Sequence, residues 1–244
     1  MAEARRYAIC FSPAPDAALT GVAASWLGRN PYSGALIDPP LLPGIGMHEI
    51  AYHTALPRRY GFHAALKSSF MIASDEDEQQ LLRALMHFAF ISDPFVLPPL
   101  TVAAIGDLLV LVPAADCPQV NALAADIVAR FDHFRAPLSE ADIERRDPDG
   151  LSPQQFANLH RWGEPNVMEA FRFHMALTGP LSARDLARFK TAASGFFAPV
   201  LTDPVTVDNI ALFVEEEPGA PFRVHSLHPM GPVRTRRSGR RRVA

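Results

Sequence analysis

The chain contains the same histidine-bearing string twice, and this repeat restricts most strongly how the chain can fold. Phe-His-x-Ala-Leu occurs at residues 62–66 and again at residues 173–177. Each copy lies in a short run that is typical of a strand. Each is followed by Ser-x-x-Asp, the pattern of a helix N-terminal cap, at Ser74–Asp77 and Ser182–Asp185. The repeat therefore predicts one α+β unit that occurs twice.

The elements around the first copy follow from apolar spacing and from glycine and proline punctuation. Before His63 these patterns predict a strand at 5–13, a helix at 16–27 and a long loop at 30–57. After it they predict a helix that starts near Ser74 and ends before Pro94, and then a hairpin that turns at Gly106-Asp107.

The second half repeats this order with one addition. A strand at 108–112 and a helix at 118–134 lead into a long polar insertion at 135–165, for which we predict a short helix at 153–162. The His174 strand and a helix from Ser182 to Phe197 follow, and a strand at 205–214 pairs back with residues 222–227.

We therefore predict an α+β fold with two pseudo-symmetric lobes. Each lobe is a mostly antiparallel sheet with helices on its outer face, and a cleft separates the two. The first lobe spans residues 1–106 and carries His63, the second spans 107–233 and carries His174, and together they form one bilobal domain. Residues 234–244 are rich in arginine and almost free of large apolar side chains, so we predict a disordered tail.

The composition indicates a soluble globular protein. Hydrophobic residues make up 48% of the chain, enough to bury a proper core. No apolar run approaches the roughly 20 residues that cross a bilayer, so no membrane partner is expected. The start of the sequence lacks the apolar region of a signal peptide. Cys10 and Cys117 lie in apolar contexts far apart, which favours buried free thiols and a cytoplasmic location.

The formal net charge of −3 hides an asymmetry, because six arginines lie in the tail 234–244 and the rest of the chain is acidic. The tail offers a weak contact for nucleic acid through counterion release, although a solvated tail without a partner is the favoured interpretation. The acidic body argues against broad duplex binding. The sequence leaves the oligomeric state open.

Two histidines on equivalent strands suggest acid–base chemistry. The alternation of a strand places His63 with Ala65 on one face, and His174 with Ala176 on one face. If the halves pack about a pseudo-twofold axis, both imidazoles face one cleft. One neutral imidazole can take a proton from an attacking water or hydroxyl, and a protonated one can give a proton to the leaving oxygen. Displacement at phosphorus needs both steps, and a cyclic or activated diester needs no metal or other cofactor.

The paired strings resemble the two-histidine phosphoesterases, whose mark is His-x-Thr/Ser-x on equivalent strands of two lobes. The stretches RRYGFHAALK, FRFHMALTG and RWGEP are most similar to the uncharacterised branch often encoded beside phosphonate-utilisation genes, and the resemblance covers residues 5–228. It implies that His63 and His174 are catalytic. It also implies hydrolysis of a small cyclic or linear phosphodiester, within phosphonate metabolism.

The chain departs from this family at both hydroxyl positions, where Ala65 and Ala176 replace the threonine or serine that binds phosphate. The loss of one donor to a charged phosphate costs roughly 1.5–3 kcal/mol, or about 10- to 100-fold. Three interpretations stay open: an enzyme, a catalytically weakened phosphate or nucleotide binder on the same scaffold, and an interaction module in which the histidines are core residues.

Other side chains near the two motifs are candidates for phosphate binding. Lys67 and Thr178 each follow their histidine by four positions and, by strand alternation, share its face. Arginine suits phosphate through its planar fork of donors. The remaining candidates are Arg58, Arg59, Tyr60, Arg172 and, more weakly, Tyr7. No metal site is expected at His48–His53, because on a helix these two histidines would lie about 140° apart.

Overall fold

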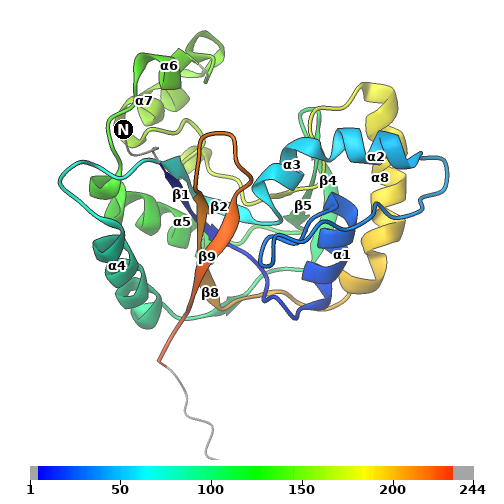
Figure 1. Ribbon diagram of the computed structural model, residues 1–244, viewed down its shortest axis with the longest axis horizontal. Coiled ribbons are helices and arrows are strands. Elements are labelled where there is room, and N and C mark those ends of the chain that lie inside the picture. The colour runs from blue at the N-terminus through cyan, green and yellow to red at the C-terminus, as the bar shows by residue number, and fades with distance from the viewer. Residues whose placement is uncertain (1–4, 145, 233–244) are drawn as a thin grey trace, which may run out of the picture.

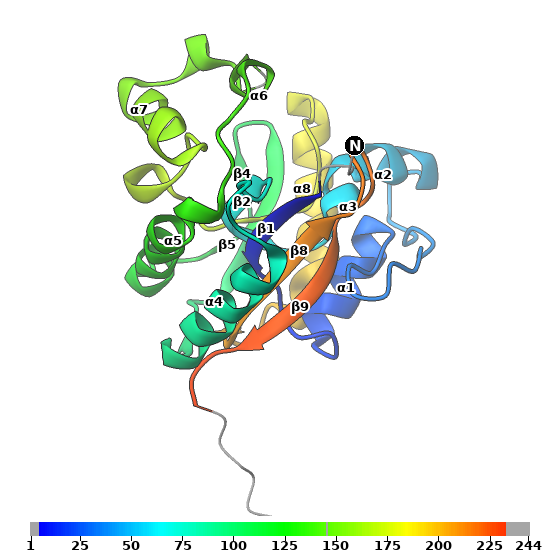
Figure 2. The same ribbon diagram turned by 60° about the vertical axis from the view of Figure 1, so that its left-hand side comes forward.

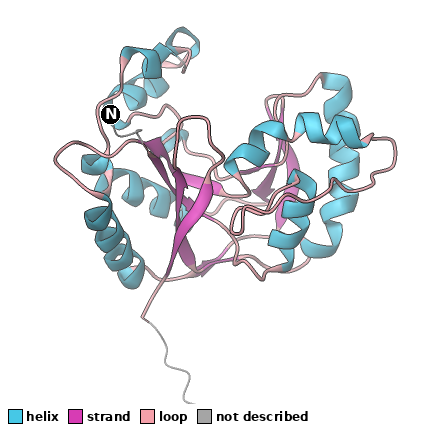
Figure 3. Cartoon of the chain, in the orientation of Figure 1, coloured by secondary structure: helices cyan, strands magenta, loops and turns pink. Residues whose placement is uncertain are grey.

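Figure 1 shows a computed structural model of the protein, which describes residues 5–144 and 146–232. Antiparallel strands occupy the middle of the molecule and helices cover the outside (Figure 3). The predicted α+β class is confirmed. The predicted arginine-rich tail at 234–244 lies outside the described residues.

The larger sheet has four antiparallel strands in the order β2-β1-β8-β9. Its members are Ala64–Phe70, Arg6–Phe11, Asn209–Glu215 and Arg223–Pro229. The second sheet has the order β4-β5-β6, with Leu100–Ile105, Leu108–Pro113 and Met175–Ala176. A small ladder joins β3, Phe95–Val96, to β7, Thr206–Val207.

The two sheets interleave along the chain. Strands β8 and β9 come from the second half but extend the sheet of β1 and β2, whereas β4 comes from the first half but pairs with β5. The lobes predicted at 1–106 and 107–233 therefore exchange strands. Two pairings between strands adjacent in the sequence were predicted and occur, β4 with β5 and β8 with β9. Pairing between distant strands is not encoded in local patterns, so the sequence did not indicate it. The edge strands β2 and β6, which follow the two histidines, lie in contact.

The helices cover the outer faces of the sheets. In the views of Figures 1 and 2, α4 and α5 lie on one side of the molecule and α1 and α8 on the other. Helices α4 and α5 contact the four-stranded sheet, whereas α8 contacts β4 and β5. The helices are α1 Ala18–Leu27, α2 Met47–His53, α3 Ala55–Tyr60, α4 Glu78–Ile91, α5 Pro118–Arg130, α6 Glu140–Glu144, α7 Pro153–Trp162 and α8 Ala183–Phe197.

Several local predictions are confirmed. Gly28 ends α1 in the left-handed conformation, with a φ of 81°. The hairpin of β4 and β5 turns at Gly106, whose φ is also positive. Helix α7 has the predicted bounds, and the Ser182 hydroxyl caps α8 by accepting a hydrogen bond from the Asp185 amide at 3.2 Å.

Two local predictions were wrong. The loop predicted at 30–57 contains α2 and begins α3. The Glu49 carboxylate accepts a hydrogen bond from the Gly46 amide at 3.3 Å at the start of α2, a helix too short for apolar spacing to reveal. The cap of α4 is Asp77 rather than Ser74, since Asp77 has Gln80 three residues later and exchanges hydrogen bonds with it.

One apolar core joins the two sheets. It runs from β1 and α1 through the second sheet to α8, and the rings of Phe11 and Phe173 meet in it with centroids 6.2 Å apart. A smaller cluster on the opposite face of the four-stranded sheet contains Ala8, Cys10, Ala211, Phe213 and Phe222. Both cysteines are buried free thiols. None of the helices in the described part of the chain is long and apolar enough to cross a membrane.

Candidate functional site

His63 lies at the junction between α3 and β2, and a glycine fixes its ring. Gly61 has a φ of 81°, and a Cβ added there would lie 2.7 Å from the Pro31 side chain, so the position favours glycine. The Gly61 carbonyl oxygen lies 3.0 Å from the His63 Nδ1 atom. A carbonyl can only accept, so Nδ1 carries the proton and Nε2 is left as the free nitrogen.

His174 repeats this arrangement immediately before β6. Its Nδ1 donates to the carbonyl oxygen of Arg172, two residues earlier, at 2.8 Å. The same bond between a histidine and the carbonyl two positions before it therefore occurs in both copies of the motif. In both copies Nε2 is the nitrogen available to act as a base or, when protonated, as an acid.

The surroundings of the two histidines differ. His63 is half-buried against Phe213, with ring centroids 5.0 Å apart, whereas His174 is exposed. Burial lowers the pKa of His63 to about 4, the Gly61 carbonyl acts in the opposite direction, and the charge of His174 lowers it further. The two rings therefore lie within electrostatic range of each other, although their strands belong to different sheets.

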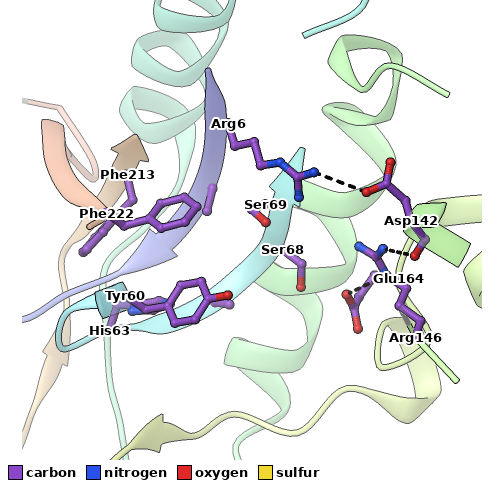
Figure 4. Close-up of a pocket in the computed structure, with 12 residues that line it drawn as sticks. Arg6, Tyr60, His63, Ser68, Ser69, Asp142, Arg146, Glu164, Phe213 and Phe222 are labelled. Carbon is purple, nitrogen blue, oxygen red and sulfur yellow. Dashed lines mark hydrogen bonds and ion pairs between the residues drawn. The ribbon is translucent and has the colours of Figure 1, made fainter. Parts of the chain in front are cut away.

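A cavity of about 380 Å³ opens beside His63 (Figure 4). Its walls come from β1, β2, the end of α3, the β8–β9 ribbon and the insertion that carries α6 and α7. Three of the predicted residues line it: His63, Tyr60 and Ala65. His174 is not among the lining residues. The remaining lining residues are Arg6, Ala8, Ser68, Ser69, Asp142, Arg146, Glu164, Phe213 and Phe222.

One wall of the cavity is aromatic. The Tyr60 ring stacks on Phe222 with centroids 5.3 Å apart and planes 26° apart, and Phe213 lies under His63. No partner for the Tyr60 hydroxyl occurs among the hydrogen bonds of the described residues, so this hydroxyl is available to a ligand. Aromatic faces of this kind suit a sugar or another flat, weakly polar group.

The prediction for Lys67 was wrong because β2 is bulged. Cys10 pairs with Ala65, but the preceding residue Ile9 pairs with Lys67, so β2 contains one extra residue at this point. The bulge shifts the alternation and turns Lys67 into the core, where it is 3% exposed and its Nζ lies 3.1 Å from Asp132. Ser68 lines the cavity in its place.

Thr178 and Tyr7 also lie in the core rather than at the cavity. Strand β6 ends at Ala176, so the alternation does not extend to Thr178, whose hydroxyl instead accepts a hydrogen bond from the Leu109 amide at 3.1 Å. Tyr7 alternates with Arg6 and Ala8 and therefore points to the opposite face of β1. Its hydroxyl donates to Glu78, and burial with this bond raises the pKa of Tyr7 to about 12.

The predicted arginines are not lining residues of the cavity. Arg58 donates to the Ala51 carbonyl at 2.7 Å, and Arg59 forms an ion pair with Glu215. The Arg172 side chain lines a separate groove, although its carbonyl holds His174.

Residues 26–29 hold both motifs in place. The Trp26 indole donates to the carbonyl of Leu177, the last residue of the second motif, at 2.9 Å. Three residues later, the buried Arg29 donates to the carbonyls of Arg58 and Arg59, just before the first motif, and to the carbonyl of Phe222. These three bonds are 2.7–3.0 Å long.

Sequence reasoning missed the polar side of the cavity, which consists of Arg6, Ser68, Ser69, Asp142, Arg146 and Glu164. Arg6 could have been found by alternation with Ala8 on β1. Ser68 and Ser69 depend on the bulge. The others lie in the insertion, whose packing against β1 through the ion pair of Arg6 and Asp142 had no signal in the sequence.

Comparison with known proteins places the chain in a family. Residues 65–223 match the family described as "Protein of unknown function (DUF1045)". The chain belongs to this family. Two relatives named "Ribose 1,5-bisphosphate phosphokinase PhnN" are similar to this DUF1045 chain. The protein from Janthinobacterium sp. (strain Marseille) is 37% identical over 89% of the chain and 49% of its own length. The protein from Laribacter hongkongensis (strain HLHK9) is 32% identical over 91% of the chain and 51% of its own length. The chain thus spans about half the length of the curated relatives it matches.

Two solved structures resemble the chain only remotely, with sequence identities below 10%. One titled "Crystal structure of phosphoesterase" has a TM-score of 0.44 and 8% identity, and covers 94% of this chain and 99% of its own. E. coli LigT complexed with 3′-AMP has a TM-score of 0.43 and 9% identity, and the match covers 93% of this chain and 99% of the LigT chain.

Proposed function

We propose that the protein hydrolyses a small phosphodiester with His63 and His174 as its acid–base pair and without a metal ion. The repeated bond from Nδ1 to the carbonyl two residues earlier carries this proposal, since it prepares both Nε2 atoms for proton transfer. Water attacks phosphorus while one imidazole accepts its proton. The bond from phosphorus to the leaving oxygen breaks as the other imidazole protonates that oxygen.

The different environments of the histidines support an assignment of roles. Burial lowers the pKa of His63 to about 4, so this ring is neutral at physiological pH and suits the general base. The proton for the leaving oxygen must then come from the exposed His174. In the reverse direction the two roles are exchanged.

The substrate class is proposed from the cavity and from the relatives. A cavity of about 380 Å³ with an aromatic wall suits a cyclic phosphodiester on a single sugar. Because the curated relatives are named for a ribose phosphate, we propose ribose as that sugar, within phosphonate metabolism in the cytoplasm. The chain has no Walker sequence and spans about half of those relatives, so we do not propose their phosphokinase activity for it.

Hydroxyl donors for the reacting phosphate are available despite Ala65. This residue is exposed in the cavity and offers no donor, but Ser68 and Ser69 follow it on the bulged strand and line the same cavity. We propose that Ser68 takes over part of the role of the missing motif hydroxyl, together with Tyr60.

Turnover of ribose 1,2-cyclic phosphate and of nucleoside 2′,3′-cyclic phosphates tests the proposal. We expect hydrolysis in the presence of a chelator, and His63→Ala and His174→Ala should each lower kcat by about 10²- to 10⁴-fold. His160→Ala, on α7 and outside the lining residues, is the matched control. An absence of turnover, also after Ala65→Thr and Ala176→Thr are combined, would contradict hydrolysis.

A second candidate function is a phosphate or nucleotide binder on the same scaffold, which the exposed Ala65 favours. It predicts thermal stabilisation by phosphorylated sugars that His63→Ala does not abolish, with no turnover in any variant. The absence of any shift with these ligands would contradict binding as well.

A further inference from the structure

Two arginines share the side of the cavity that is away from His63. In Figure 4, Arg6, Arg146, Asp142 and Glu164 gather on this side, whereas Tyr60 and His63 lie on the other. Arg6 comes from β1, and the other three come from the insertion or its end. The proposed acid–base pair uses none of these four side chains.

The strand pairing indicates how far apart the two sides are. Phe11 pairs with Ala64, next to His63, whereas Arg6 lies five residues earlier on β1. With a rise of about 3.3 Å per residue, the α-carbons of Phe11 and Arg6 are about 16 Å apart. Arg6 and His63 nevertheless line one cavity of about 380 Å³, which leaves room between them for a group of the size of a sugar.

The carboxylate partners leave both guanidinium groups with free donors. Arg6 contacts Asp142 through one terminal nitrogen at 3.2 Å, and its side chain is 28% exposed. Arg146 donates one nitrogen to the Asp142 carbonyl at 2.8 Å, and its Nε lies 3.8 Å from Glu164, a loose ion pair. A guanidinium has five N–H donors, so each arginine retains several that can face a ligand.

We propose that Arg6 and Arg146 bind a second phosphate of the substrate, at the opposite end of the cavity from the phosphorus that reacts. This inference rests on the proposed function, and it narrows the substrate to a sugar that carries a cyclic phosphodiester at one end and a phosphate monoester at the other. Two guanidinium groups held from different elements suit a dianion, which accepts several charge-assisted hydrogen bonds.

Neutralising a carboxylate that pairs with these arginines tests the proposal through a gain of binding, which misfolding of a variant cannot produce. Glu164 competes with the second phosphate for Arg146, so its neutralisation should strengthen binding of a bisphosphate. If these ion pairs only stabilise the insertion and its contact with β1, Glu164→Gln should leave that binding unchanged or weaken it.

Isothermal titration calorimetry with ribose 1,5-bisphosphate and ribose 1-phosphate measures the contribution of the second phosphate without any turnover. We expect the wild-type protein to bind the bisphosphate about 10- to 100-fold more tightly. Arg6→Gln and Arg146→Gln should each reduce this ratio by about tenfold and change binding of ribose 1-phosphate less than twofold. Glu164→Gln should raise the ratio about threefold or more, whereas Arg188→Gln and Glu169→Gln, both outside the cavity lining, should not change it.

A wild-type ratio near one, or a ratio that Arg146→Gln and Glu164→Gln both leave unchanged, would overturn the inference. Circular dichroism checks that each variant is folded. If the arginine variants are misfolded, the result for Glu164→Gln alone decides whether the inference holds. A preserved ratio together with no turnover of any cyclic diester would refute the hydrolysis and retain the second phosphate site. Turnover of a cyclic diester without preferential binding of the bisphosphate would refute the second phosphate site and retain the hydrolysis.

Discussion

The two copies of the histidine motif share one hydrogen bond and little else. In both, Nδ1 donates to the carbonyl two residues before. The first copy then continues into a seven-residue bulged strand and has a half-buried histidine beside a cavity, whereas the second has a two-residue strand and an exposed histidine. A short repeated sequence can therefore fix the orientation of a ring, while the more distant packing determines its solvation.

This difference matters because burial disfavours the protonated form of His63. With both histidines in the same environment, neither would be preferred as the base. The unequal burial of His63 and His174 breaks that symmetry, so a duplicated motif can supply two different chemical roles.

The largest effect is expected where the first copy is anchored. Arg29 is 5% exposed and donates to three backbone carbonyls. Arg29→Met should lower the free energy of unfolding by about 3–5 kcal/mol, because it removes three charge-assisted bonds in a buried place. Urea denaturation measures this. Arg58→Met, which loses one such bond to Ala51, is the control and should cost about 1 kcal/mol. Equal losses in the two variants would show that Arg29 does not anchor the first copy.

An intermediate effect is expected from pH. The pKa of His63 is lowered to about 4 in the folded protein, against about 6.5 in the unfolded chain. Between these values the unfolded chain binds the proton and the folded protein does not. Stability should therefore be fully present above pH 6.5 and fall by up to about 3 kcal/mol as the pH drops to 4.

Chemical denaturation at several pH values, on the wild-type protein and on His63→Gln, measures this contribution. The variant should show a flatter curve between pH 4 and 6.5. Some slope should remain, because burial and the neighbouring His225 also lower the pKa of His228. Coincident curves would mean that burial of the first histidine has no thermodynamic consequence, and the contrast between the two copies would lose its electrostatic basis.

The smallest effects are expected at the equivalent positions Lys67 and Thr178. Thr178→Val removes the only hydroxyl that accepts from the Leu109 amide in the described structure, and should cost about 1–2 kcal/mol. Lys67→Met should cost less than about 1 kcal/mol, because Asp132 keeps its ion pair with Arg135 and a buried charge is removed. Thermal unfolding ranks the two variants. A larger loss for Lys67→Met would mean that its ion pair contributes more than the hydroxyl bond.

Local signals predicted much of the fold. Glycine at the end of α1, the hairpin turn at Gly106 and the Ser182 cap each depend on residues close together in the sequence, and the structure has all three. The partners of the strands depend on packing between distant segments. This is why the exchange of strands between the predicted lobes was not visible.

The same distinction applies to the candidate site. His63 and Ala65 belong to the repeated string and Tyr60 precedes it by two residues, so the motif pointed directly to the three predicted residues that line the cavity. Lys67 was misplaced because strand alternation fails at a bulge, and a bulge is defined by the partner strand β1 rather than by β2 alone. Arg6 shares a strand face with Ala8, but its contact with Asp142, more than a hundred positions later, is not visible in the sequence.

The short span from Trp26 to Arg29 has a consequence for the rate of any reaction in this cavity. Since one end of it is hydrogen-bonded to the second motif and the other end to the residues just before the first, a shift of either backbone segment would break a bond on α1 or just after it. The two segments thus keep their relative position before a ligand arrives. A site whose supporting backbone is already in place loses less translational and rotational freedom on the way to a transition state.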